Sequence, residues 1–258
     1  MPEQLDLRVT WLGHSTVLLE LQGQRIITDP FLRDRLGPLR RAGPLPDIEA
    51  LGPIDVVLIS HAHPDHFDRR SLRRLAGNPV VIVPTGLGRT IAALGLRAHE
   101  LSVGDRLEIG ATSVTALPAH HGRWPRHPYA ATIGYLIDGP PRIYFAGDTS
   151  RFADLIDLVR GVDVALLPIG SWGPHRAPWH LGPIGAARLA ADIGAKAVIP
   201  IHWGTLYPGG LERVWPSALQ RPATAFRLAS AQLAKEVDIR VLQPGDTTTF
   251  ADGDATAG

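Results

Sequence analysis

The chain has 258 residues, of which 45% are hydrophobic, as is typical of one large globular domain. Its 26 Lys and Arg residues nearly balance its 25 acidic residues, so the net charge of +1 gives no electrostatic reason to expect a nucleic-acid or membrane partner. The absence of cysteine excludes disulfides and thiolate ligands, and any metal site must use His, Asp, Glu and water. The N-terminus lacks a signal-like segment, and no run approaches the ~20 apolar residues that span a bilayer, so we expect a cytoplasmic protein.

The N-terminal region predicts a meander of short strands. Residues 7–12, 16–21 and 25–28 alternate apolar with polar side chains and are joined through Gly13 and a turn at 22–24. A Pro- and Gly-rich loop follows at 37–53. The next predicted elements are a buried strand at 56–59, a short helix at 71–75, a strand at 80–83 and a helix at 87–94.

A second group of strands follows and then gives way to alternating strands and helices. The meander comprises strands at 106–109, 113–117, 131–137 and 142–145, with helical periodicity after it at 152–159. The alternating part comprises strands at 164–167, 197–201 and 239–242 and helices at 183–192 and 224–235. This pattern predicts a single domain at 1–250 in which two sheets pack face to face with helices outside. We expect residues 251–258 to form a flexible tail.

The most informative stretch is His61-Ala62-His63-Pro64-Asp65-His66, directly after the buried strand at 56–59. His61 and His63 are two positions apart and point to the same side, and Pro64 biases the backbone toward a turn before Asp65 and His66. A lone histidine here would suit a surface loop or a satisfied buried position. So many groups that titrate near neutral pH would repel one another without a metal. The stretch therefore predicts a metal site suited to zinc, and nearly as well to manganese or iron.

Three further strand exits carry a side chain that can bind a metal. They are His120-His121 after the strand at 113–117, Asp148 after 142–145, and His202 after 197–201. Each lies beside small or turn-forming residues, which let the backbone approach an ion closely. Taken alone, Asp148 would suit an Asx turn or the N-cap of the helix at 152–159. Because the loop at 61–66 already predicts a metal site, we favour a ligand role for Asp148.

These motifs resemble those of the metallo-β-lactamase-fold hydrolase superfamily in order and rough spacing, over nearly the whole chain. They are the HxHxDH stretch at 61–66, Pro118-Ala119-His120-His121, Phe145-Ala146-Gly147-Asp148-Thr149 and Pro200-Ile201-His202-Trp203-Gly204. Weaker markers resemble the branch that contains N-acyl-phosphatidylethanolamine phospholipase D and ascorbate-6-phosphate lactonase. These are Trp11-Leu12-Gly13-His14-Ser15, Thr28-Asp29-Pro30-Phe31 and His180 in His-Leu-Gly-Pro.

The resemblance implies an α+β fold, a four-layer αββα sandwich of two mixed sheets with a dinuclear metal site at one edge. It implies two divalent ions, Zn²⁺ first and Mn²⁺ or Fe as alternatives. On the family pattern one ion is bound by His61, His63 and His121, the other by Asp65, His66 and His202, and Asp148 bridges them. The branch pattern Pro-Ala-x-His selects His121 over His120, which we then expect to orient a neighbour.

The implied activity is hydrolysis by a hydroxide that bridges two ions about 3.5–4 Å apart. The expected substrate is a small-molecule phosphodiester, lactone or related ester, and an anionic molecule that contains phosphate is one candidate. The alternative is a nucleic-acid processing nuclease, which should bring a basic tract that this neutral chain lacks. Asp65 is a candidate proton acceptor, and His180 and His14 are candidate leaving-group acids. A structural hydrogen bond for His14 and a helix cap for His180 are the alternatives.

Two loops that mix aromatic and basic residues are expected to face the centre, at 122–129 and 171–179. Such loops can bind an anionic group with an apolar substituent through Arg contacts. Alternatively they are solvated loops whose aromatic residues cover the sheet edge. The segment at 203–215 is a third candidate lid.

Overall fold

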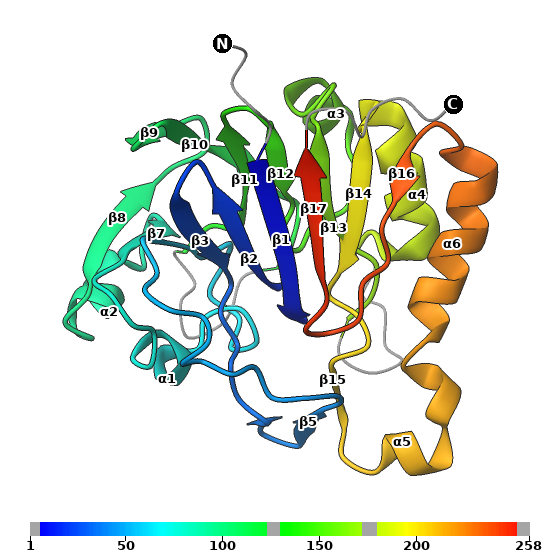
Figure 1. Cartoon of the computed structure of the whole chain (residues 1–258), viewed down its shortest axis with the longest axis horizontal. Helices are drawn as coiled ribbons and strands as arrows, with labels where there is room; N and C mark the ends of the chain where they lie inside the picture. The colour runs from blue at the N-terminus through cyan, green and yellow to red at the C-terminus, as the bar shows by residue number, and fades with distance from the viewer. Residues whose placement is uncertain (1–5, 123–129, 172–179, 252–258) are drawn as a thin grey trace.

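Two seven-stranded sheets pack face to face and helices cover their outer faces (Figure 1). The structure is a computed structural model that describes residues 6–122, 130–171 and 180–251. The arrangement is the four-layer αββα sandwich, so the predicted fold class is confirmed. Within the described ranges, no helix combines the length and the apolar character needed to cross a bilayer.

The first sheet has the order β17-β1-β2-β3-β6-β7-β8, antiparallel from β17 to β3 and parallel beyond. Its strands are β1 (Asp6–Gly13), β2 (Thr16–Leu21), β3 (Gln24–Thr28), β6 (Val56–Leu58), β7 (Val80–Pro84), β8 (Arg97–Leu101) and β17 (Thr247–Ala251). Leu7, Val9 and Trp11 alternate along β1 and are fully buried against the second sheet. The outer face packs on α1 (Arg69–Leu72) and α2 (Gly88–Ala92).

The second sheet has the order β16-β14-β13-β12-β11-β10-β9, antiparallel from β9 to β12 and parallel from β12 to β16. Its strands are β9 (Arg106–Ile109), β10 (Thr112–Pro118), β11 (Ile133–Asp138), β12 (Ile143–Phe145), β13 (Val164–Pro168), β14 (Ala197–Ile201) and β16 (Asp238–Ile239). The helices α3 (Ala153–Leu158), α4 (Gly182–Ile193) and α6 (Arg221–Leu233) pack on this half of the molecule (Figure 1). Strands β12 to β14 are buried on both faces, which explains their continuous apolar runs.

A third, small sheet joins two loops near the ends of the large sheets. It has the order β15-β5-β4, with β4 (Arg35–Leu36), β5 (Leu39–Arg41) and β15 (Leu206–Pro208), followed by α5 (Leu211–Val214) and a 3₁₀ turn at Pro216–Ala218. The predicted loop at 37–53 therefore contains a strand, and the predicted lid at 203–215 is partly built into this sheet. The Arg41 guanidinium donates hydrogen bonds to three backbone carbonyls, those of Leu12, Phe31 and Arg33.

The prediction from sequence was wrong at the sheet edges. Strands β8 and β17 were not predicted because both are edge strands, largely exposed to solvent, and lack an alternating apolar pattern. Ala251 belongs to β17, so it is not part of a tail, and residues 252–258 lie outside the described ranges. The strand expected at 239–242 is the short β16, and the helix expected at 71–75 is α1, which begins two residues earlier.

Candidate metal centre

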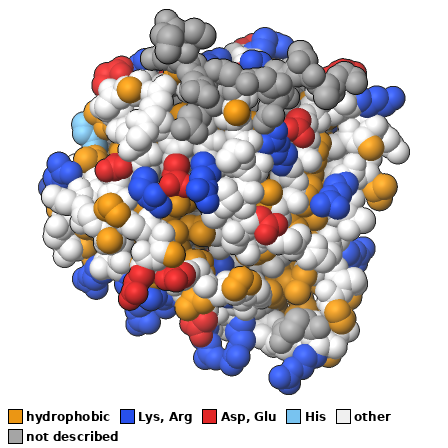
Figure 2. All heavy atoms as spheres, viewed as in Figure 1, with side chains coloured by type: hydrophobic (Ala, Val, Ile, Leu, Met, Phe, Trp, Pro, Cys, Tyr) orange, Lys and Arg blue, Asp and Glu red, His pale blue; other side chains and the backbone are white. Residues whose placement is uncertain are grey.

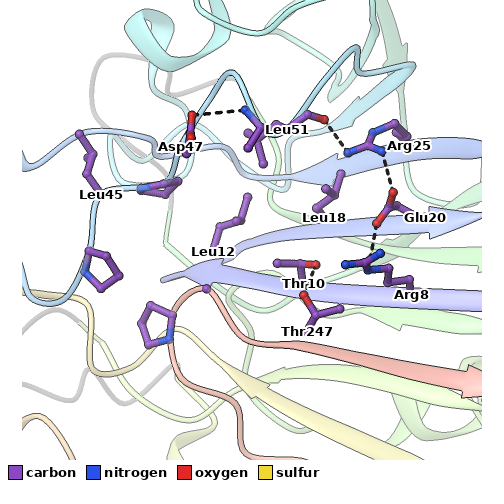
Figure 3. Close-up of a pocket in the computed structure, with 15 residues that line it drawn as sticks. Arg8, Thr10, Leu12, Leu18, Glu20, Arg25, Leu45, Asp47, Leu51 and Thr247 are labelled. Carbon is purple, nitrogen blue, oxygen red and sulfur yellow. Dashed lines mark hydrogen bonds and ion pairs between the residues drawn. The ribbon is translucent and has the colours of Figure 1, made fainter.

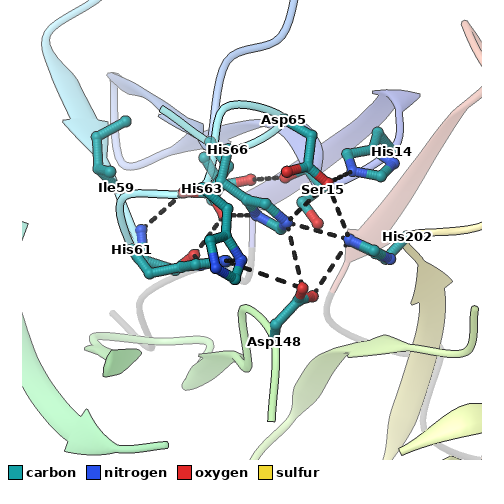
Figure 4. A network of polar contacts seen from close by, with 12 residues as sticks. His14, Ser15, Ile59, His61, His63, Asp65, His66, Asp148 and His202 are labelled. Carbon is teal, nitrogen blue, oxygen red and sulfur yellow. Dashed lines mark hydrogen bonds and ion pairs between the residues drawn. The ribbon is translucent and has the colours of Figure 1, made fainter. Parts of the chain in front are cut away.

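The side chains predicted to bind metal meet at one edge of the sandwich (Figure 4). His61, His63, Asp65 and His66 follow β6 of the first sheet. The other three follow β10, β12 and β14 of the second sheet and are His121, Asp148 and His202. Rigid buried strands from both sheets thus position all seven side chains.

Three imidazoles form the first group of this centre. His63 Nδ1 lies 2.9 Å from His61 Nε2 and 3.1 Å from His121 Nε2. Asp148 Oδ2 lies 4.0 Å from His61 Nε2 and 3.7 Å from His121 Nε2. The three rings present nitrogen atoms to one small space and can hold a metal ion.

Two imidazoles and a carboxylate form the second group. His66 Nε2 and His202 Nε2 are 3.0 Å apart, and Asp65 Oδ2 lies 3.6 Å from the first and 3.8 Å from the second. Asp148 lies against this group as well, with Oδ2 3.3 Å from His66 Nε2 and Oδ1 3.3 Å from His202 Nε2. The Asp148 carboxylate therefore faces both groups.

The buried Asp29 determines which nitrogens of two rings face the centre. Its carboxylate accepts the Ser60 N–H at 2.7 Å, the Ser60 hydroxyl at 2.6 Å and the His66 Nδ1–H at 2.7 Å. Because the Ser60 hydrogen is used on Asp29, the Ser60 oxygen accepts the Nδ1–H of His61 at 2.9 Å. When both rings are neutral, each therefore turns an Nε2 lone pair inward, the form that binds a metal.

The electrostatics of the centre also fit a cation. Burial alone would raise the pKa of Asp148, but His202 and His66 outweigh it and hold this pKa well below the usual range. Burial likewise opposes protonation of His66, yet the carboxylates of Asp148, Asp65 and Asp29 hold its pKa well above the usual value. Asp148 Oδ1 has no hydrogen-bond partner among the described residues. Buried carboxylates so arranged require positive charge between them, which a divalent ion supplies.

His14 lies behind Asp65 in this arrangement. Its Nε2 is 2.9 Å from Asp65 Oδ2, and both residues are buried. Burial, with a contribution from His202, lowers the pKa of His14 to about 3, so the ring is neutral and its Nε2–H donates to the carboxylate. His14 adopts a φ of 54°, a left-handed conformation fixed by hydrogen bonds of its own N–H to Thr205 and of the His202 N–H to its carbonyl.

His180 lies beside the first group. Its Nε2 is 3.5 Å from Asp148 Oδ2, and its ring centroid is 4.8 Å from that of His121. Burial lowers the pKa of His180, and Asp148 opposes this shift. The N-cap of α4 is Leu181, so His180 does not cap this helix.

The two adjacent histidines after β10 face different ways. His121 points into the centre, whereas the His120 ring stacks on Phe152 with a centroid distance of 3.8 Å and is exposed. Asp148 is not the N-cap of α3, because that position is Phe152. His121 thus lies among the candidate ligands and His120 does not, and the choice of His121 as a ligand stays a prediction.

Asp29 contacts the proposed ligand His66 but was not predicted from sequence to support it, since Thr28-Asp29-Pro30-Phe31 served only as a family marker. The sequence did contain a signal, because Asp29 directly follows the end of β3. The proposed ligands likewise follow the ends of strands. Its φ of 34° and its hydrogen bonds to residues 31 and 37 positions away are not evident from sequence. The predicted substrate loops lie almost wholly outside the described ranges.

A separate groove of about 470 Å³ lies on the outer face of the first sheet (Figure 3). Leu12 and Leu18 lie on its floor, and a chain of ion pairs from Arg8 through Glu20 to Arg25 borders it. Leu12 faces this groove while His14, two positions on, faces the metal centre. None of the residues that line the groove belongs to the metal centre.

Comparison with known proteins agrees with this geometry. The family model described as "Beta-lactamase superfamily domain" matches residues 24–203. A UPF0173 metal-dependent hydrolase of Desulforamulus reducens is 30% identical, over 93% of this chain and 98% of the relative. N-acyl-phosphatidylethanolamine-hydrolyzing phospholipase D 1 of Caenorhabditis elegans is 33% identical over 79% of this chain, and the match spans 65% of that relative.

A solved structure supports the fold. Igni18, described as a novel metallo hydrolase from Ignicoccus hospitalis, superposes with a TM-score of 0.72 at 22% identity, over 95% of this chain and 98% of that one. The matched family model covers the strand exits that carry Asp29, the HxHxDH stretch, His121, Asp148 and His202. The chain therefore belongs to the metallo-β-lactamase-fold superfamily of metal-dependent hydrolases.

Proposed function

We propose that this chain uses a dinuclear metal centre to hydrolyse a small-molecule phosphodiester. The observation that carries the proposal is the position of Asp148, whose carboxylate faces two separate groups of donors. One group is His61, His63 and His121, and the other is Asp65, His66 and His202. A shared carboxylate between two donor sets suits two divalent ions, for which Zn²⁺ is our first candidate and Mn²⁺ or Fe the alternatives.

Among esters, a phosphodiester is favoured over a lactone by the relatives. Two of them, from Caenorhabditis elegans and Saccharomyces cerevisiae, are named N-acyl-phosphatidylethanolamine-hydrolyzing phospholipase D. The chain spans 65% and 48% of their lengths, so their lipid substrate is not carried over. Only the bond type, a phosphodiester, enters the proposal.

The proposed roles follow from the contacts. Divalent ions held by these residues would supply Lewis acidity and would make a bound water molecule more acidic. Asp65 accepts a proton from the attacking water, and the neutral His14 holds the Asp65 carboxylate in place through the 2.9 Å contact. His180 protonates the leaving alkoxide. It lies 3.5 Å from Asp148, whose charge opposes the lowering of the His180 pKa by burial.

The nuclease alternative is less well supported. Basic and acidic side chains are interspersed over most of the face drawn in Figure 2, so its described residues offer no continuous basic track for a nucleic-acid backbone. The net charge of +1 agrees with this.

The test is to assay metal-loaded protein on bis-p-nitrophenyl phosphate, a lactone panel and structured RNA. We expect metal-dependent turnover of the phosphodiester. Asp148→Ala should lower metal content and activity together, whereas Asp157→Ala, at an exposed position on α3, should change neither. Turnover of only the lactones or only the RNA would reject the proposed bond type. An unchanged Asp148→Ala variant would remove Asp148 from the centre.

A further inference from the structure

Ser15 carries a buried hydroxyl that nothing in the described protein satisfies. The residue is fully buried, and its Oγ has no hydrogen-bond partner among the described residues. The side chains on either side of Ser15 do have partners. His14 contacts Asp65 at 2.9 Å, and Thr16 Oγ1 donates to the Asp29 carbonyl at 2.9 Å. Buried hydroxyls usually have a partner, so an unpaired one beside a functional centre needs an explanation.

Ser15 lies beside the metal centre (Figure 4). Ser15 lies in the turn between β1 and β2, between His14, which contacts Asp65, and Thr16, which binds the Asp29 carbonyl. At this end of β2 the space between the sheets holds the metal centre instead of apolar core. Figure 4 shows Ser15 next to His14, on the side of the cluster where Asp65 and His202 approach each other.

We propose that the Ser15 hydroxyl donates a hydrogen bond to an oxygen of the anionic group bound at the metal centre. This inference rests on the proposed function, in which that group is a phosphate ester or its product. A fixed hydroxyl donor in a site closed to bulk water stabilises developing negative charge effectively. Ser15 would then contact the substrate, a role separate from the seven proposed metal ligands.

The experiment compares three variants with the wild-type protein. Ser15→Ala removes the hydroxyl and Ser15→Thr keeps it. Ser113→Ala is the matched control, because Ser113 is also buried with an unpaired Oγ but lies near the start of β10, at the opposite end from His121. The measurements are zinc content, thermal unfolding, binding of inorganic phosphate to the zinc-loaded protein by calorimetry, and kcat and KM for bis-p-nitrophenyl phosphate.

We expect Ser15→Ala to weaken phosphate binding about tenfold, which corresponds to about 1.4 kcal/mol, with zinc content unchanged. Ser15→Thr should restore most of this affinity, and Ser113→Ala should bind phosphate as the wild type does. Equal phosphate affinity in Ser15→Ala and wild type would overturn the inference. Loss of zinc from Ser15→Ala would also overturn it, because the hydroxyl would then support the ligands instead of the anion.

Phosphate binding is measured without turnover, so the two proposals fail separately. A wild-type protein that binds phosphate through Ser15 but does not cleave the diester would reject the proposed function and keep the role of Ser15. If the wild type cleaves the diester but Ser15→Ala binds phosphate equally well, the proposed function is kept and the role of Ser15 is rejected. A wild type that binds no phosphate would reject the inference about Ser15.

Discussion

An Asp29→Asn substitution removes the charge that orients two of the proposed metal ligands and leaves the backbone largely undisturbed. Asp29 has a φ of 34°, a region that Asn tolerates almost as well as Asp does. The carboxylate receives three hydrogen bonds, two from Ser60 and one from His66. An amide offers one acceptor oxygen, and its NH₂ group turns a donor toward the remaining N–H or O–H. At least one of these bonds is therefore lost.

The size of the effect follows from that loss. A hydrogen bond to a charged group contributes about 1.5–3 kcal/mol, and about 1.4 kcal/mol corresponds to a tenfold change in an equilibrium constant. We therefore expect Asp29→Asn to weaken zinc binding about 10- to 100-fold, the usual range for groups that support a metal ligand. Competition with a chromogenic chelator measures this affinity, and kcat/KM for bis-p-nitrophenyl phosphate should fall with it.

The matched control is Asp55→Asn. Asp55 also accepts a backbone N–H, that of Arg25 at 2.8 Å, but it lies at the opposite end of β6 from the metal centre. We expect this variant to bind zinc as the wild type does. Equal zinc affinity in the two variants would refute the reasoning, because the Asp29 charge would then have no part in orienting His61 and His66.

Three further predictions test the arrangement around the centre. His121→Ala should lower metal content and activity, and His120→Ala should leave both near wild type because its exposed ring points away; equal losses by metal analysis would contradict this. The pKa of His14 is about 3 in the folded protein and about 6.5 when unfolded, so between these values the unfolded chain binds more protons. The metal-free protein should therefore lose stability as the pH falls from about 6.5 toward 4, and His14→Asn should flatten this dependence in urea unfolding; parallel curves would count against it. Arg41→Met leaves three backbone carbonyls without the Arg41 donor and should lower the free energy of unfolding by about 3 kcal/mol or more. A decrease below about 1 kcal/mol would show that these three hydrogen bonds do not stabilise the fold.

The central strands and the residues that follow them were predictable, because apolar runs mark the buried strands and clustered His and Asp residues mark the site after them. Strands such as β6 and β14 are buried on both faces, so their sequences are continuous apolar runs that end abruptly in polar residues. The polar residues after them include the proposed metal ligands. The division of these donors into two groups around Asp148 followed from family resemblance, and periodicity alone does not give it.

The remaining features depend on contacts between distant parts of the chain. His14 lies 51 positions from Asp65, and nothing in the local sequence indicates that their side chains meet. Strand β5 pairs with β15, more than 160 positions away, and its short basic sequence has no strand pattern. Strands β8 and β17 are edge strands that bury little surface, so selection for apolar alternation is weak there.

The pairing of β17 with β1 has a consequence for the order in which the molecule is completed. The pairing runs from Asp6 opposite Ala251 to Thr10 opposite Thr247, and the Trp11 N–H then donates to the Asp246 carbonyl. During synthesis, β1 thus has an open edge until residue 251 has left the ribosome. The turn that follows β1 holds His14 and Ser15. His14 and Ser15 are the first residues of the centre to be translated. The strand that leads to them gains its second neighbour, β17, only after residue 251 has been translated.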